Sequence, residues 1–303
     1  MELLLIFGFL ISLVVLVKSS DLVVEKAEAL AQYLGLPSFF IGVTLVSIGT
    51  SLPELASSLM AVQHGTPALV GANVVGSNIA NTFLILGVSL LMLKKTVKLK
   101  WNMLYADITF LVAATFLFTL FTIDRFLAPP EIILLISLYI AYLLFLKNQK
   151  RIEQSSAEFH LWDVGLLLIG LVLVYLSADA LVSSGIALAR LLGVPQSWIG
   201  LTAIALGTSL PELSVSAAAA RKGNIDMAVA NVTGSNLFNL LGVATIPALL
   251  NGAIVDNFTT SVFPYLWFSA FMFLLIFLDN RAHKYEGMVA IILYLAFLLE
   301  YIL

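Results

Sequence analysis

Long apolar stretches, separated by short polar segments, follow one another along this 303-residue chain. A helix of about 20 apolar residues crosses the hydrocarbon core of a bilayer, which is roughly 30 Å thick. Ten stretches of suitable length occur, with approximate bounds 3–24, 38–62, 68–93, 102–122, 130–147, 162–189, 196–220, 226–250, 260–279 and 285–303. The pattern therefore predicts an all-α membrane protein with ten transmembrane helices.

The composition agrees with a chain that lies in a membrane. Hydrophobic residues make up 61% of it and charged residues only 11%, whereas soluble domains carry about 25% charged residues. The longest polar stretch, Lys147 to His160, is too short for a soluble domain. We therefore expect one transmembrane domain over 1–303, in which a cytoplasmic linker (148–160) joins residues 1–147 to residues 161–303. The chain has no cysteine, which excludes disulfides and thiolate metal sites.

Lysines and arginines gather on one side of the predicted helices. Cytoplasmic loops of membrane proteins carry an excess of these residues. With the N-terminus outside, the inner loops hold Lys26, Lys94, Lys95, Lys98, Lys100, Lys147, Lys150, Arg151, Arg221, Lys222, Arg281 and Lys284. The outer loops then hold only Arg125 and Arg190. We therefore expect a multi-pass protein of the cell membrane whose two termini are both extracellular.

The chain contains an internal repeat. The segment from Gly49 to Leu55, Gly-Thr-Ser-Leu-Pro-Glu-Leu, recurs from Gly207 to Leu213 at an offset of 158 residues. At the same offset, 22 of the 47 positions from Gly35 to Asn81 are identical without a gap. Each half holds five predicted helices, an odd number, so the second half enters the membrane in the opposite orientation. Inverted repeats are the plan of many secondary transporters, whose substrate site lies near the midplane where the halves meet.

Polar side chains form a strip on each of four predicted helices, two from each half. Residues three or four positions apart share one face of a helix. The strips are Ser47, Thr50, Ser51 and Glu54; Thr208, Ser209 and Glu212, with Ala205 in place of the first serine; Asn73, Ser77 and Asn81; and Asn231, Ser235 and Asn239. Such strips either join helices through hydrogen bonds or line a path for a polar substrate.

The two glutamates favour a path for a substrate. A carboxylate near the centre of a bilayer is costly, and ionisable residues there mark ion or substrate pathways. A protonated glutamate with a purely structural role is the alternative, and the matched placement of Glu54 and Glu212 in the two halves weighs against it. Two ionised glutamates can be neutralised by one Ca²⁺ or compensated by a few Na⁺. One pocket can then bind either Ca²⁺ or Na⁺, but not both at once.

Proline interrupts the second and seventh predicted helices at the repeated motif. Pro53 and Pro211 lack an N–H, which is expected to leave backbone carbonyls around 47–50 and 205–208 without helical partners. Unwound backbone inside a membrane is tolerated where it lines a cavity, and its carbonyls can coordinate cations. Together with carboxylate, hydroxyl and amide oxygens, these carbonyls form an all-oxygen ligand set. Such a set suits Ca²⁺ or Na⁺ better than zinc or copper.

These motifs resemble the alpha repeats of the cation/Ca²⁺ exchanger superfamily. Each Gly-Thr-Ser-Leu-Pro-Glu segment is followed by a Gly-Ser-Asn-x-x-Asn segment, at Gly76–Asn81 and Gly234–Asn239. The likeness is greatest to the archaeal and bacterial sodium/calcium exchangers, and it covers the whole chain in the number and spacing of helices. The resemblance implies a core of helices two, three, seven and eight, against which helices one and six slide.

The resemblance also implies a set of ligands. Glu54 and Glu212 would be the central Ca²⁺ carboxylates, with main-chain carbonyls of Thr50 and Thr208. The residues that would line Na⁺ positions or complete the middle of the site are Ser51, Ser77, Ser209, Ser235, Asn81, Asn239 and, through their carbonyls, Ser47 and Ala205. Some archaeal relatives carry an aspartate at the position of Asn239. Potassium-dependent exchangers typically carry one at the position of Asn81, which argues against K⁺ cotransport.

We therefore expect a sodium/calcium antiporter that works by alternating access around Glu54 and Glu212, and not an enzyme. Its partners would be Ca²⁺, Na⁺ and the lipid bilayer, without a cofactor or nucleic acid, and we expect a monomer. An H⁺/Ca²⁺ or other divalent-cation antiporter on the same scaffold is the nearest alternative. An intramembrane hydrolase is an alternative from another class, although the chain has no Gly-x-Ser-x-Gly or His-Glu-x-x-His motif. A non-transporting scaffold protein would tolerate glutamine at both glutamates.

Overall fold

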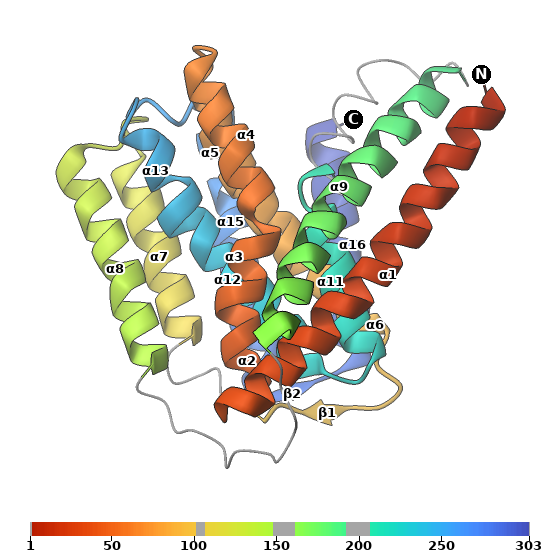
Figure 1. Ribbon diagram of the computed structural model, residues 1–303. Helices are drawn as coiled ribbons and strands as arrows, with labels where there is room; N and C mark the ends of the chain where they lie inside the picture. The colour runs from red at the N-terminus through yellow and green to blue at the C-terminus, as the bar shows by residue number, and fades with distance from the viewer. Residues whose placement is uncertain (1, 101–106, 148–160, 192–206, 303) are drawn as a thin grey trace.

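The computed structural model describes residues 2–100, 107–147, 161–191 and 207–302, which fold almost entirely as helices (Figure 1). The first half contains α1 (Glu2–Leu34), α2 (Ser38–Ile41), η1 (Gly42–Val46), α3 (Ser47–Thr50), α4 (Leu52–Gln63), α5 (Ala68–Ala80), η2 (Asn81–Ile85), α6 (Leu86–Leu91), β1 (Val97–Lys98), α7 (Asp107–Phe121) and α8 (Pro129–Lys147). The second half contains α9 (Leu161–Leu191), α11 (Leu210–Arg221), α12 (Ile225–Phe238), η4 (Asn239–Val243), α13 (Thr245–Ala248), α14 (Asn257–Ser261), α15 (Phe263–Ile276), β2 (Arg281–Ala282) and α16 (Lys284–Ile302).

Several of these helices are long and apolar enough to cross a membrane. Among the described residues, five meet this criterion: Leu5–Leu34, Ser38–Gln63, Ala68–Leu91, Pro129–Leu146 and Trp162–Leu181. The predicted all-helical, membrane-type fold is therefore present. Parts of the predicted stretches 102–122 and 196–220, and the linker 148–160, lie outside the described residues.

The first helix is longer than its apolar stretch. α1 continues to Leu34 instead of ending near residue 24, because the polar segment that follows is rich in good helix formers such as glutamate, lysine, alanine and leucine. Lys26 therefore lies within a helix and not in a loop, and its Nζ is 2.9 Å from Asp163 Oδ1 of α9. At 1.5 Å per residue, the helix is roughly 50 Å long. A helix of this length is inclined in a hydrocarbon core of about 30 Å.

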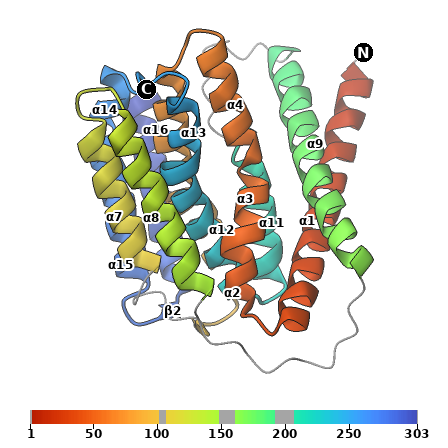
Figure 2. The ribbon, with the colours of Figure 1, turned by 60° about the vertical axis from the view of Figure 1, so that its left-hand side comes forward.

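α1 and α9 pack against each other along one side of the molecule (Figure 1, Figure 2). In the C-terminal half of α1, polar contacts join this helix to the turn between α11 and α12. Arg221 Nη2 is 2.5 Å from Asp21 Oδ1, Lys222 Nζ donates to the Asp21 carbonyl at 2.7 Å, and Asn224 Nδ2 donates to Glu28 Oε1 at 2.5 Å. The α1–α9 pair is therefore fixed to the core at this end, whereas α1 and α4 diverge toward the other end (Figure 1).

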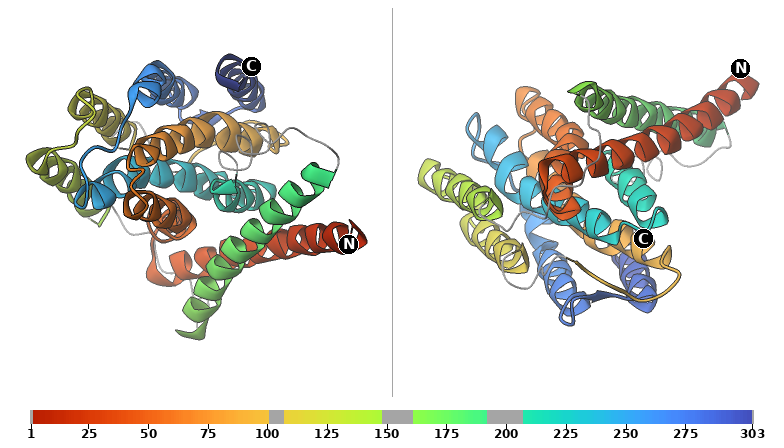
Figure 3. Two further views of the ribbon diagram at one scale, coloured as in Figure 1. Left: turned by 90° about the horizontal axis from the view of Figure 1, so that it is seen from above. Right: turned by 60° about the horizontal axis from the view of Figure 1, so that its bottom comes forward.

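α12 is the most deeply buried of the core helices. All 14 of its residues are buried. A helix that is buried on every side is usually apolar, yet α12 carries Asn231, Thr233, Ser235 and Asn236. Their polar groups need partners on the helices that contact α12, which include α2, η1, α3 and α11. Seen from above, α7 with α8, α15 with α16, and α1 with α9 lie around this core (Figure 3).

In the part of the chain that the structure describes, three π-helical segments interrupt the core helices: η1, η2 and η4. Two of them, η2 and η4, begin at Asn81 and Asn239, which are 158 residues apart and therefore occupy matched positions in the two halves. In each segment the carbonyl of the asparagine accepts an N–H from five residues later, at Leu86 and Ala244. Such wide turns occur frequently at functional sites. Because the two turns occupy matched positions, Asn81 and Asn239 are candidate functional residues.

A small antiparallel ribbon departs from the all-α prediction. β1 pairs with β2 through Val97 with Ala282 and Lys98 with Arg281. The two strands belong to the loop after α6 and the loop between α15 and α16. Residues outside a helix have unpaired backbone N–H and C=O groups, and pairing of the two loops satisfies some of them. The apolar pattern cannot reveal this contact, because it depends on two loops from different halves.

Gly234 lies where α12 passes close to η1 and α3. A Cβ atom at this position would lie 2.3 Å from Ser47 Oγ and 2.5 Å from the carbonyl oxygen of Val43. Because the carbonyl is part of a helical backbone, it cannot rotate away as a flexible side chain can. The glycine therefore permits the close approach of the two halves.

We expect Gly234→Ala to destabilise the protein by about 1–3 kcal/mol, the usual cost of overpacking a core, and to lower its thermal midpoint in detergent. Gly165→Ala is the control, because Gly165 is an exposed helical residue without an atom within 4 Å of its Cβ position among the described residues. Alanine is the better helix former, so the control should keep or raise the midpoint. Equal midpoints for the two variants would contradict the close approach.

Candidate cation site

The repeated Gly-Thr-Ser-Leu-Pro-Glu motif interrupts a helix in the first half. α3 ends at Thr50 and α4 begins at Leu52, and Ser51 between them has φ −91° and ψ 7°, in the bridge region. Pro53 stands in the first turn of α4, where a missing N–H is tolerated because the first N–H groups of a helix have no partner within it. Glu54 follows in the same turn. The interruption thus places its carboxylate at the N-terminal end of α4.

The second half has the same local geometry. α11 begins at Leu210, Ser209 precedes it at φ −87° and ψ 0°, and Glu212 stands in its first turn. α4 and α11 each contain 12 residues. Helix N-termini carry a partial positive charge, which favours a carboxylate at that place. Ala205 of the predicted ligand set lies outside the described residues.

Hydrogen bonds join the two halves at the glutamates. Ser51 Oγ lies 2.7 Å from Glu212 Oε1 and 3.0 Å from Ser235 Oγ. All three side chains are buried. The interruption in the first half therefore touches both the carboxylate of α11 and a serine of α12. Residues that the sequence predicted to share a site thus meet in the core, although about 160 to 180 residues separate them along the chain.

Two asparagines outside the predicted ligand set hold the glutamates in place. Asn73 Nδ2 donates to the carbonyl of Glu54 at 3.1 Å, and Asn231 Nδ2 donates to that of Glu212 at 3.4 Å. Each asparagine also bonds the serine four residues after its glutamate, at 3.0 Å. Thr50 Oγ1 is 3.3 Å from Asn231 Oδ1. The polar strips contained both asparagines, but only the contacts reveal that they orient α4 and α11.

Several buried polar atoms of the site have no hydrogen-bond partner within the described part of the chain. They are both carboxylate oxygens of Glu54, Oε2 of Glu212, the hydroxyl of Ser209, and the side-chain amide atoms of Asn81 and Asn239. A buried polar group without a partner costs about 1–3 kcal/mol. Such groups are rare in folded proteins and require an explanation, such as an ion or ordered water. Most of these atoms are oxygens, which points to a cation.

The other predicted side chains lie on the same elements. Ser77 is buried on α5, with its hydroxyl 3.5 Å from Asn73 Oδ1. Thr208 is partly buried just before α11. The strip on the third predicted helix therefore lies on α5 and the start of η2, next to the interruption between α3 and α4, because α4 contacts α5 directly.

The backbone at Ser47 differs from the expectation. Its carbonyl accepts the N–H of Ser51 at 3.0 Å and the hydroxyl of Thr50 at 3.2 Å. The prediction of free carbonyls from residue 47 onward is thus wrong at this position, because the helical turn continues to Ser51. Pro53 removes only the N–H that would bond the carbonyl four residues earlier, at Gly49.

The arrangement suits a hard cation that takes oxygen ligands. Carboxylate, hydroxyl and amide oxygens are typical ligands of Ca²⁺. No group of three or more His, Cys, Asp or Glu comes together among the residues that the structure describes. Two carboxylates supply the charge of the site, and neutral oxygens surround them. Nitrogen and sulfur ligands of the kind that select zinc or copper are not part of it.

Known proteins with similar sequences include ion exchangers. The family model described as "Sodium/calcium exchanger protein" matches residues 4–147 and 162–302. The sodium/calcium exchanger MaX1 of Methanosarcina acetivorans is 32% identical, over 95% of this chain and 96% of its own length. The inner membrane protein YrbG of Escherichia coli is 34% identical, over 82% of this chain and 80% of its own.

The fold is similar to that of a solved exchanger. The structure of the sodium-calcium exchanger NCX_Mj soaked with Na⁺ and Sr²⁺ has a TM-score of 0.84 and 30% sequence identity to this chain, with 98% of each chain covered. The same protein soaked without Na⁺ and Ca²⁺ has a TM-score of 0.85 and 29% identity. The likeness therefore extends over both halves of the chain.

A cation held by these oxygens would stabilise the folded protein. We expect Ca²⁺ to raise the thermal midpoint in Na⁺-free detergent solution, because a ligand at 100 times its Kd adds about 2.7 kcal/mol. Glu212→Gln keeps the size of the side chain, removes its charge and should abolish the rise. Glu131→Gln is the control, since Glu131 accepts the N–H of Ala128 at the start of α8 and lies outside the site. A Ca²⁺-dependent rise that survives in Glu212→Gln would show that Ca²⁺ binds elsewhere.

Proposed function

Because this chain belongs to the sodium/calcium exchanger family, we propose that it is an antiporter that exchanges Na⁺ for Ca²⁺ across the cell membrane. The observation that carries the proposal is the pair of buried glutamates, one from each half, with Ser51 of one half bonded to Glu212 of the other. Buried charges are stable only when they are compensated. One Ca²⁺ or several Na⁺ can supply this compensation. Exchange requires that Ca²⁺ and Na⁺ compete for the same set of oxygen ligands.

The proposed arrangement in the membrane follows from the repeat. All ten apolar stretches would cross the bilayer within one domain, with 1–147 and 161–303 as two five-helix halves of opposite orientation. The matched interruptions before Glu54 and Glu212 support this arrangement, as do the matched π-helical turns that begin at Asn81 and Asn239. The site would lie near the midplane, where inverted halves meet. Both termini would face the outside, and a monomer would suffice.

The roles within the site follow from charge and from the unpaired atoms. Glu54 and Glu212 would hold Ca²⁺, and carbonyls of Thr50 and Thr208 would complete its shell. The remaining predicted ligands would bind Na⁺ or line the middle of the site: Ser47, Ser51, Ser77, Asn81, Ala205, Ser209, Ser235 and Asn239. Of these, Ser209, Asn81 and Asn239 have unpaired side-chain atoms among the described residues, which makes them the readiest neutral ligands.

Alternating access requires that α1 and α9 leave the core at one end and approach it at the other. In the conformation described here, Asp21 and Glu28 tie α1 to Arg221, Lys222 and Asn224 at the end remote from the N-terminus. Release of these contacts would open that end. The exchanger would therefore pass through a second state in which this polar cluster is separated.

The absence of cysteine from the chain makes this movement testable with a single introduced thiol. Ala220 directly precedes Arg221 on α11 and is only 4% exposed. In an Ala220→Cys background, we expect Asp21→Asn to raise labelling by a membrane-impermeant maleimide by up to about fivefold, since an exposed ion pair is worth roughly 0.2–1 kcal/mol. Asp179→Asn is the matched control, because Asp179 is the repeat counterpart of Asp21 and is exposed. Equal labelling of the two variants would contradict a role of the cluster in closure.

The exchange itself is tested by uptake of radioactive Ca²⁺ into proteoliposomes loaded with NaCl, KCl or choline chloride, with and without a pH gradient. We expect uptake only with an outward Na⁺ gradient. Glu54→Gln and Glu212→Gln should each reduce it to the level of protein-free vesicles, because each removes half of the compensating charge. Glu131→Gln should leave uptake unchanged, since it lies outside the site.

The other outcomes separate the alternatives. Uptake driven by the pH gradient alone would keep the site and make H⁺ the counter-ion. If none of the gradients drives uptake into vesicles that contain protein with a normal thermal midpoint, calcium transport would be contradicted. Full uptake by both glutamine variants would show that the glutamates are structural.

A further inference from the structure

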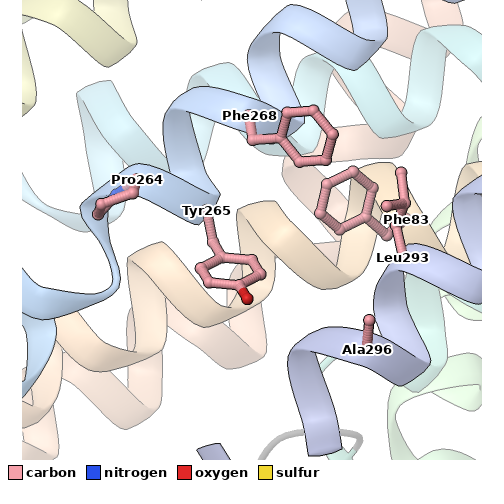
Figure 4. Close-up of a pocket in the computed structure, with 6 residues that line it drawn as sticks. All are labelled: Phe83, Pro264, Tyr265, Phe268, Leu293 and Ala296. Atoms are coloured by element: carbon pink, nitrogen blue, oxygen red, sulfur yellow. The ribbon is translucent and has the colours of Figure 1, made fainter. Parts of the chain in front are cut away.

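A groove of about 270 Å³ lies between α15, α16 and η2 (Figure 4). The residues that line it are Phe83, Pro264, Tyr265, Phe268, Leu293 and Ala296. Its walls are apolar except for the hydroxyl of Tyr265. The rings of Phe83 and Phe268 are tilted at 56° to each other, with centroids 5.9 Å apart. None of these residues belongs to the candidate cation site.

The groove is a feature of the second half of the chain and not of the repeat. At the offset of 158 residues, Ala296 corresponds to Leu138, a side chain three carbons larger. Leu293 corresponds to Leu135, which is completely buried in the first half, whereas Leu293 is only partly buried. The small side chain of Ala296 thus leaves open a space that the leucine side chain can fill in the first half.

The surface of α16 beside the groove is strongly apolar. Met288, Ile292, Leu295 and Leu299 are each more than half exposed. In a membrane exchanger such a surface faces hydrocarbon, because transmembrane helices present their apolar side chains to lipid. The volume of the groove is slightly below the roughly 300 Å³ at which pockets for small ligands begin. A single slender chain fits this space better than a bulky side-chain cluster of a second helix.

One end of the groove carries a negative charge. The hydroxyl of Tyr265 donates to Glu300 Oε2, and Glu300 lies one turn beyond Ala296 on α16. Glu300 is exposed, and the last turn of α16 has no basic residue. Tyrosine is enriched at the level of lipid headgroups. The pair therefore offers a carboxylate and a phenol to a cationic headgroup at the edge of the hydrocarbon layer.

We propose that this groove binds one acyl chain of a phospholipid with a primary-amine headgroup, with the chain against Phe83 and Ala296 and the ammonium group at Glu300. Phe83 lies two residues after Asn81 in the same π-helical segment. The bound chain supports that segment from its outer side. The inference requires only that the protein lies in a bilayer, and it does not depend on which ions are exchanged.

The test uses the full-length protein in vesicles that contain phosphatidylethanolamine with a photoactivatable acyl chain. After irradiation, mass spectrometry should find the label on Phe268 and Leu293. Ala296→Leu introduces the larger side chain that the repeat counterpart Leu138 has, so it should fold, fill the space and lose this labelling. Val289→Leu is the matched control, because it enlarges an exposed side chain of α16 outside the groove and should keep the labelling. Equal labelling of Ala296→Leu and the native protein would overturn the proposal.

The headgroup is tested separately by competition. Unlabelled phosphatidylethanolamine should displace the labelled lipid better than phosphatidylglycerol, which has no amine. Glu300→Gln keeps a hydrogen-bond acceptor for Tyr265 and should lose this preference, while labelling within the groove remains. A preference that survives in Glu300→Gln would overturn the role of the carboxylate. Cross-links from Leu293 to a second copy of the chain, with a dimer by light scattering, would assign the groove to self-association and overturn the lipid site.

Discussion

Two carboxylates that share one buried core are the constraint on which this structure depends. Glu54 and Glu212 are each about 1% exposed, and a buried ion without compensation costs several kcal/mol. Two features of the fold reduce that cost. Each glutamate stands in the first turn of a short helix, at its positive end, and Ser51 donates to Glu212. Neutral oxygens of the site also lack partners, and the proposed cation would remove both this cost and what remains of the first.

The charge of each glutamate can be compensated in this way only if the short helix that carries it, α4 or α11, is held in place within the core. α4 and α11 begin in the middle of the core, where their first N–H groups have no helical partner. Asn73 and Asn231 anchor them by donating to the carbonyls of the two glutamates. These amides have a place because α5 and α12 pack closely against the interrupted helices, and Gly234 permits that approach. Close packing and charge compensation are therefore two aspects of one arrangement.

Periodicity and the internal repeat could predict much of this fold, because both can be recognised in the sequence without knowledge of contacts between helices. Apart from the end of α1, the apolar stretches located the described helix ends to within a few residues, and spacing placed the predicted ligands on common helix faces. Predictions were wrong where the outcome depended on other elements or on polar sequence. Helix α1 continues through a polar segment to Leu34, β1 finds a partner in a distant loop, and Ser47 keeps its helical hydrogen bond. The groove at Ala296 could not be predicted from the sequence either, since it depends on which side chains surround a single small residue.

The duplication keeps contacts even where it does not keep residues. Tyr142 Oη donates to Asp107 Oδ1 at 2.7 Å and joins α7 to α8. At the matched positions 158 residues later stand Glu300 and Tyr265, so the acid and the tyrosine have changed places, and their hydrogen bond joins α15 to α16. An alignment of the halves registers two mismatches here, yet one donor and one acceptor link the same pair of helices in both. In the flanking helices any complementary pair satisfies this requirement. At the candidate site both glutamates keep their residue type at the matched positions, as expected if each carboxylate holds the proposed cation, because a neutral donor cannot replace that charge.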